Sequence, residues 1–137
     1  MSFRRGDVVL LRRAGGQRHA GRAALIWRVD GDDIRFLLIV GVRSFDRGQK
    51  HRAEIDMDPK EAWSLGLPMT CPVLICTHEN KLDVARLPSR EPVGRASDAL
   101  MFIATQTVAR EIQSRQTEDR LSYRPKLSYA IEMTAPR

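Results

Sequence analysis

The first thirty residues contain two short apolar segments joined by a loop rich in glycine and arginine. The first segment covers 7–12 and follows a basic pair and a Gly-Asp turn, and the second covers 22–29. The loop between them holds Arg18 and His19. Apolar runs bounded by turn residues are typical of strands. The pattern therefore predicts a small β-barrel with a cationic loop over one mouth, which suits a polyanion better than a small apolar ligand.

Size and composition predict one soluble globular domain. The 137 residues are enough to bury a core without disulfides, and 42% hydrophobic with 29% charged residues is ordinary for such a domain. No apolar run approaches the roughly 18–20 residues of a membrane span, and the first residues lack the features of a signal peptide. We therefore expect a cytoplasmic protein with no membrane partner.

The chain is strongly basic, with a formal net charge of +6 and a pI of about 10.0. Arginine, which can bind a phosphate through two parallel hydrogen bonds, is more frequent than lysine. The charge indicates contact with nucleic acid or another polyanion. The alternative is a solvated basic surface, and the charge alone does not distinguish the two.

Further apolar segments alternate with turn signals along the chain. Asp30 and Asp33 bound an acidic hairpin turn, and the apolar run after it is continuous enough to be buried on both faces. We expect strands at 34–42, 51–57 and 70–77, a short segment at 81–87, and a loop at 88–95. Asp58 is expected to cap a short helix that has Pro59 in its first turn and ends near Gly66.

A long helix is expected at 98–115, with Ser97 as its cap. Apolar residues at helical spacing predict one face packed on the barrel: Leu100, Ile103, Ala104, Val108 and Ile112. We therefore divide the chain into a barrel domain with its helix, 1–115, and a polar C-terminal extension, 116–137. Residues 127–131 either add an edge strand or belong to a tail that becomes ordered on a partner.

The cysteines and tryptophans are interpreted as structural residues. Cys71 and Cys76 lie in one predicted strand at an odd spacing, so they point to opposite faces and cannot bridge each other. No further cysteine or histidine stands at zinc-ligand spacing. We expect buried, reduced thiols and no metal. Trp27 and Trp63 are expected in the core or at a dimer interface, and Trp27 alternatively stacks on a base.

The order of these elements resembles that of the MazF/PemK toxin family, the mRNA interferases, over residues 3–115. Arg-Gly-Asp-Val-Val at 5–9 resembles the family's opening, and 21–26 lies where the family has Arg-Pro and an apolar strand. The stretch 38–44 lies where the family has a strand that ends in Ile-Thr. Asp-Val-Ala-Arg-Leu at 83–87 resembles the family's Asp-x-x-Arg-Leu motif.

The resemblance implies an α+β fold: a small SH3-like β-barrel of five to seven mostly antiparallel strands, with a short inserted helix and a long C-terminal helix. It implies a homodimer whose RNA groove crosses both barrels. It also implies a toxin that cleaves single-stranded RNA without a metal or another cofactor, and a cognate antitoxin protein that restrains it.

The family's catalytic residues are carried over position by position. Arg22 matches the catalytic arginine, and Ala23 replaces the proline that follows it in the family. The catalytic threonine falls on Arg43, and Ser44 comes one residue later. A shift of one residue on a strand reverses the face, so Ser44 replaces the threonine only where a bulge or turn redirects it.

Metal-free RNA cleavage needs a group that activates the 2′-hydroxyl, an acid for the leaving 5′-oxygen, and cations that stabilise the phosphorane. We therefore predict a catalytic set, Arg22, Ser44 and His78, and an RNA-binding set, Arg18, His19, Arg43, Arg47 and Lys81. His19 and His78 act as an acid–base pair if their loops meet over one mouth, and otherwise are exposed loop residues. Glu79 is either a further candidate base or a solvated turn residue.

Two other hypotheses stand beside the toxin. One is a member of the same fold that has lost cleavage and binds nucleic acid or a protein partner, since Ala23 and Arg43 replace family residues. The other is an accessory domain. Cleavage predicts a titratable or hydroxyl group beside Arg22, whereas binding alone predicts a basic surface without one.

Overall fold

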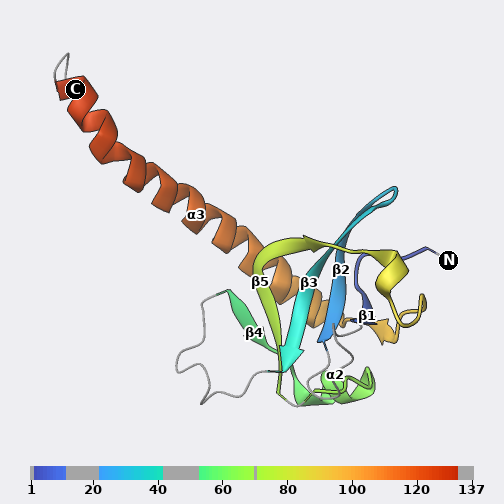
Figure 1. Ribbon diagram of the computed structural model, residues 1–137. Coiled ribbons are helices and arrows are strands. Elements are labelled where there is room, and N and C mark those ends of the chain that lie inside the picture. Colours follow the sequence, from blue (N-terminus) through green and yellow to red (C-terminus); the bar gives the residue numbers. More distant parts are fainter. Residues whose placement is uncertain (1, 12–21, 42–52, 70, 133–137) are drawn as a thin grey trace.

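The protein has an α+β fold built on one curled antiparallel sheet, with a long helix at its side (Figure 1). The computed structural model describes residues 2–11, 22–41, 53–69 and 71–132, the last of these as helical backbone alone from 119 onward. Six strands pair in the order β4-β5-β3-β2-β1-β6 and form a half-barrel. The strands are β1 (Asp7–Leu11), β2 (Arg22–Asp30), β3 (Asp33–Gly41), β4 (Glu54–Asp56), β5 (Pro72–Lys81) and β6 (Gly94–Arg95).

Among the described residues, three helical segments accompany the sheet: α2 (Pro59–Ser64), the 3-10 turn η2 (Val84–Arg86) and α3 (Asp98–Glu132). The predicted cap of the short helix is confirmed, because the Asp58 carboxylate accepts a hydrogen bond from the Lys60 amide at 2.9 Å. The predicted class, the antiparallel strands and the long C-terminal helix are confirmed as well.

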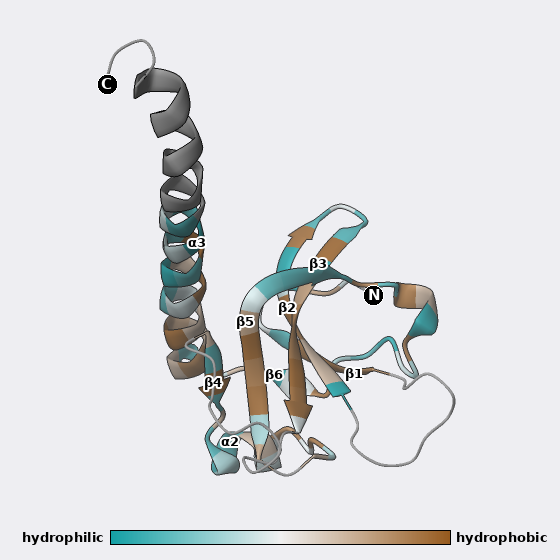
Figure 2. Cartoon of the chain, turned by 60° about the vertical axis from the view of Figure 1, so that its left-hand side comes forward, coloured by the Kyte–Doolittle hydropathy of each residue, from teal (hydrophilic) through white to brown (hydrophobic). Residues whose placement is uncertain are grey.

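Strand β2 is buried on both of its faces. Neighbouring residues of a strand point to opposite sides. Ala23, Leu25 and Trp27 belong to one hydrophobic core, which we call the first core, and Ala24 and Ile26 belong to the second core. Figure 2 shows the same continuous apolar colouring along the central strands. The expectation that the run after the hairpin is buried on both faces is also confirmed, since Leu37 and Ile39 join the first core and Ile34 and Phe36 join the second.

Different parts of the chain cover the two faces. The first core includes Leu65, which follows α2, and Leu100 and Ala104 of α3. The second core is completed by Phe3 of the N-terminal segment and by Leu82 and Leu87, which flank η2. The sheet is therefore the middle layer between the helices and the segments around η2.

Strand β5 is longer than the sequence indicated. The predicted strand ended before His78, which was placed in the loop after it. β5 instead continues to Lys81, because a register shift beside Phe36 and Leu38 of β3 lets the pairing resume at Asn80. His78 is therefore a strand residue. The separate segment expected at the end of this region is replaced by η2.

The start of α3 is fixed by a contact with α2. The Ser97 hydroxyl accepts a hydrogen bond from the Leu100 amide at 3.1 Å, as expected of a helix cap. The Glu61 carboxylate accepts hydrogen bonds from the Ser97 amide at 2.6 Å and from the Ser97 hydroxyl at 2.9 Å. One serine therefore both caps α3 and joins it to α2.

α3 extends well beyond its predicted end. It continues to Glu132 and projects away from the sheet (Figure 1), so the predicted end at 115 and the alternative edge strand at 127–131 are wrong. The residues just after 115 are polar, but glutamine, glutamate and arginine are good helix formers. Polarity was a poor guide here because it describes exposure and does not end a helix.

The buried stripe of α3 also differs from the predicted one. It comprises Leu100, Ala104, Thr107 and Glu111, which follow helical spacing, and Val108 packs beside it. Ile103 and Ile112 are 45% and 49% exposed, so their predicted burial is wrong. The two isoleucines lie on either side of this stripe. The stripe is apolar at its N-terminal end and polar at its C-terminal end, where Thr107 and Glu111 lie.

Replacing Ser97 with alanine should lower the free energy of unfolding by about 1–2 kcal/mol, because it removes a helix cap together with a hydrogen bond to Glu61. Urea denaturation followed by circular dichroism measures the change. Ser89→Ala is the matched control, since the Ser89 hydroxyl accepts from the Glu91 amide in an exposed turn. Equal effects of the two substitutions would contradict the role assigned to Ser97.

Candidate nucleic-acid interface

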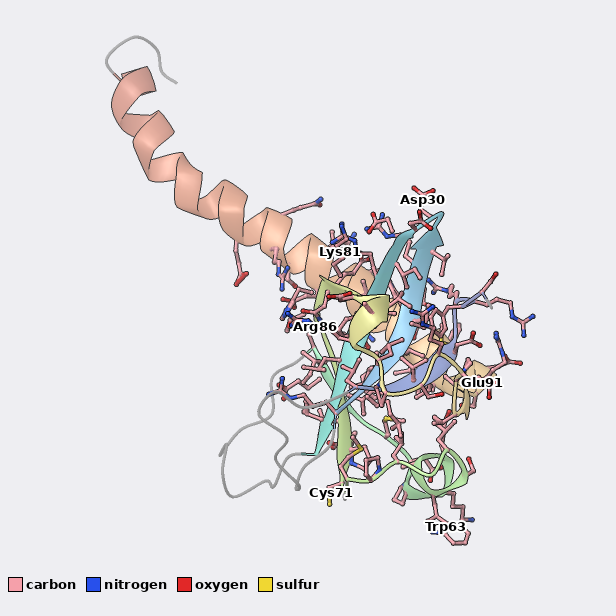
Figure 3. The ribbon with its side chains drawn as sticks, turned by 45° about the vertical axis from the view of Figure 1, so that its right-hand side comes forward. Asp30, Trp63, Cys71, Lys81, Arg86 and Glu91 are labelled. Carbon is pink, nitrogen blue, oxygen red and sulfur yellow. The ribbon has the colours of Figure 1, made fainter. Side chains whose placement is uncertain are left out.

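Arg22 lies at one end of the sheet, where four strands begin or end. It opens β2 and is paired with Leu11, the last residue of β1, and with Val40 near the end of β3. Gly41, the last residue of β3, is paired with Pro72, the first residue of β5. We call this the Arg22 end of the sheet. The tip of the β2–β3 hairpin lies at the opposite end (Figure 3).

The Arg22 side chain is exposed on the side of the second core. Directly paired residues of an antiparallel sheet share a face, so Arg22 stands beside the half-buried Leu11 and Val40. No hydrogen bond or ion pair joins the Arg22 side chain to another residue within the described ranges. Its guanidinium is therefore available to an anion from solution as far as these ranges extend.

Several other arginines are bonded to carboxylates. The pairs are Arg28–Glu79 and Arg95–Asp7 at 2.7 Å, Arg35–Asp33 at 2.9 Å, Arg115–Glu111 at 3.1 Å and Arg86–Asp83 at 3.4 Å. The hydrogen bond that Arg28 donates to Glu79 raises the pKa of Arg28 above its ordinary value, aided by the charge of the same carboxylate. These arginines contribute little net positive charge to the surface around them. Arg22 differs from them in this respect.

The net charge of the chain is concentrated in two stretches of sequence. The stretches 12–21 and 42–52 contain seven of the 23 lysine and arginine residues and one of the 17 acidic residues, which equals the whole formal charge of +6. The rest of the chain is formally neutral. The first stretch joins β1 to β2 and the second follows β3, so both are attached at the Arg22 end. The predicted site residues Arg18, His19, Arg43, Ser44 and Arg47 belong to these stretches and lie outside the described residues.

The structure does not bring the remaining predicted residues to Arg22. His78 lies near the far end of β5, where its Nδ1 is 2.8 Å from the Thr77 hydroxyl oxygen. Lys81 is paired with Arg35, close to the hairpin tip. Arg22 is instead level with the start of β5. The expected meeting of His78 with Arg22 is therefore not found, and Lys81 is separated from Arg22 by most of the length of the strands.

Of the two tryptophans, Trp27 lies in the core as expected, whereas Trp63 does not. Trp27 is 6% exposed in the first core, and the Arg5 guanidinium lies 4.0 Å above its ring. Arg5 also donates hydrogen bonds to the Trp27 carbonyl at 2.9 Å and to the Thr105 hydroxyl at 3.1 Å, so Trp27 cannot offer a face to a base. Trp63 is 87% exposed on α2, so the core alternative of its prediction is wrong, and a place at a dimer interface stays a prediction. Ala62 and Leu65 take the buried side of this short helix.

The cysteines are both free, as expected, but only one is buried. Cys76 lies in the first core, and burial raises the pKa of its thiol to about 12. Cys71 is exposed, so its predicted burial is wrong. It precedes β5 with a φ of 49°, a turn conformation that places it outside the strand in which the sequence had put it.

The described part of the chain contains neither a candidate metal site nor a helix that could cross a membrane. No group of three or more histidine, cysteine, aspartate or glutamate side chains is placed to hold a metal ion there. Within the same residues, every helix is too short or too polar to cross a membrane.

A thiol reagent such as dithionitrobenzoate at pH 8 should modify one thiol of the folded chain rapidly and the second only on unfolding, because Cys76 is buried and protonated. Cys71→Ser should abolish the rapid phase. Since the folded state holds the Cys76 proton up to about pH 12, folding stability should fall as the pH rises above the thiol's ordinary pKa. Rapid labelling of both thiols would contradict the burial of Cys76.

Comparison with known proteins adds no relative to this description. No protein-family model matches the sequence, and no curated protein is significantly similar to it.

Proposed function

We propose that this protein binds single-stranded RNA at the Arg22 end of its sheet. The observation that carries the proposal is the distribution of charge. Five arginines elsewhere on the described surface are bonded to carboxylates, whereas Arg22, like Arg4, Arg90 and Arg110, is exposed without such a bond to a described residue. The two stretches that hold the whole formal net charge are attached at the same end.

The chemistry of arginine explains why this end suits a nucleic acid. A guanidinium can donate two parallel hydrogen bonds to one phosphate, and each neutralised phosphate releases counterions to solution. Leu11 and Val40 beside Arg22 are half-buried and apolar, a surface on which the flat face of a base can rest. The resemblance to the MazF/PemK toxins, with their SH3-like barrel, supports RNA as the polyanion.

The second candidate function is metal-free cleavage of the same RNA by an endoribonuclease toxin. The observation that favours it is Arg22 itself, which matches the family's catalytic arginine and is exposed at the start of β2. In this function Arg22 stabilises the charged phosphorane, and a second group must move the protons. Ser44 is the proposed hydroxyl group, and a homodimer and an inhibitory antitoxin belong to the same proposal.

Arg22→Ala should weaken binding to a 12-nucleotide oligouridylate several-fold. It should also make the slope of log affinity against log salt concentration less negative by about 0.7, the contribution of one phosphate contact on a single strand. Fluorescence anisotropy at several salt concentrations measures both quantities. Arg28→Ala is the matched control, because Arg28 is paired with Glu79 toward the opposite end of the sheet. Equal losses in the two variants, or no binding by the unaltered protein, would overturn the proposal.

Incubation with a long single-stranded RNA in EDTA distinguishes the two candidate functions. Discrete fragments from the unaltered protein and none from Arg22→Ala would establish a metal-free ribonuclease that uses Arg22. Intact RNA that still shifts on a gel at low salt would leave a binding protein without cleavage. A mock preparation carried through the same purification controls for contaminating ribonuclease.

A further inference from the structure

Trp63 is the most exposed large apolar side chain of the described residues. Its exposed fraction is 87%, against 64% for Phe102, the next in order. In solution an indole this exposed is costly, because its apolar surface remains in contact with water. Figure 3 shows the ring pointing away from the body of the protein. Nothing in the packing of α2 requires a tryptophan here, since Ala62 and Leu65 make the helix's contacts with the core.

Trp63 lies at the same end of the molecule as Arg22. The Met57 amide, just before α2, donates a hydrogen bond to the Pro72 carbonyl at 3.0 Å. Pro72 is paired with Gly41, which follows the residue paired with Arg22. Figure 3 confirms this placement: Trp63 and Cys71, the residue before Pro72, lie at one end, and Asp30 lies at the other.

We propose that the Trp63 indole is a stacking platform for a base of the single-stranded RNA held at the Arg22 end. Base stacking on an exposed aromatic ring is the usual companion of a cationic surface in proteins that bind single strands. The arginine holds a phosphate on the second-core side of the sheet end, and the ring takes a base further along the strand, after the strand has passed around this end to the side of α2. Lys60 shares a face of α2 with Trp63, one helical turn before it, and adds a positive charge beside the ring.

This inference rests on the proposed function, and it adds a residue that neither the charge pattern nor the resemblance indicated. It is also specific about the chemistry recognised. A polyphosphate has the charge of RNA but no bases, so Trp63 contributes to binding only where a base is present. The stacking is tolerant of sequence, because every base has a flat face.

The test compares two probes of equal length and charge, a 12-nucleotide oligouridylate and its abasic counterpart. Trp63→Ala should weaken binding to the oligouridylate by about 5- to 150-fold and leave binding to the abasic strand unchanged. Trp63→Phe should retain most of the affinity, because it keeps an aromatic face. Ile112→Ala is the matched control, since it shortens another exposed apolar side chain, far along α3.

Fluorescence supplies an independent readout, because Trp27 and Trp63 are the only tryptophans of the chain. Oligouridylate should quench the emission of the unaltered protein, and Trp63→Phe should lose the quenching while the emission of buried Trp27 remains. Circular dichroism verifies that each variant is folded. We expect both Trp63 variants to fold, because the Trp63 side chain is exposed.

The outcomes separate this inference from the proposed function. If the unaltered protein binds neither probe, the proposed function fails, and the inference fails with it. If the unaltered protein binds the oligouridylate, but Trp63→Ala weakens the binding of both probes equally or of neither, the inference alone is overturned. If Trp63→Ala leaves RNA binding unchanged and alters the oligomeric state measured by light scattering, Trp63 is a protein contact, and the inference is likewise overturned.

Discussion

The fold depends on the burial of both faces of the β2–β3 hairpin. Leu25 and Leu37 of the first core and Ile26 of the second are completely buried, and each such side chain contributes about 1.5–3 kcal/mol relative to an exposed position. A hairpin with two apolar faces has no stable state of its own in water. It needs a layer on each side, which explains why α3 crosses one face and why the N-terminal segment and the residues around η2 lie on the other.

A two-faced apolar sheet also limits where a binding site can be placed. Both faces of its middle are used for packing, so polar contacts with a ligand are confined to the two ends of the strands. The hairpin end carries arginines that are bonded to carboxylates, such as Arg28 to Glu79. The other end carries Arg22 and the attachment points of the two stretches that hold the net charge. Trp63 belongs to this second end.

Much of the fold was predictable because it follows from local patterns. Alternating and continuous apolar runs indicated β1, β2 and β3, and the side chain of Asp58 indicated the start of α2. The errors came from features that the hydrophobic pattern does not show. A register shift extended β5 past His78, and polar residues after α3's predicted end were good helix formers. Neither the register shift that extends β5 nor the length of α3 can be read from hydrophobic periodicity.

The candidate site was predictable only in part, for a similar physical reason. Arg22 was identified through the resemblance to the MazF/PemK family, whose catalytic arginine it matches, and its place at the start of an apolar strand puts it at a strand end in any pairing. Trp63 was missed because a helix as short as α2 has too few residues to define a buried face, and a tryptophan is by default assigned to the core. His78 was misplaced because its distance from Arg22 depends on how β5 is paired, a property of the sheet as a whole.

The register shifts in the sheet explain why the two ends differ electrostatically. Arg28, Arg35 and Lys81 are aligned on three neighbouring strands, an arrangement in which like charges repel. Each of the two arginines is bonded to a carboxylate, and these carboxylates offset the repulsion. An anion that approached Arg28 or Arg35 in this row would have to displace a bonded carboxylate, which a contact with Arg22 does not require among the described residues. This difference supports placing the proposed RNA at the Arg22 end, even though the hairpin end presents more basic side chains in a row.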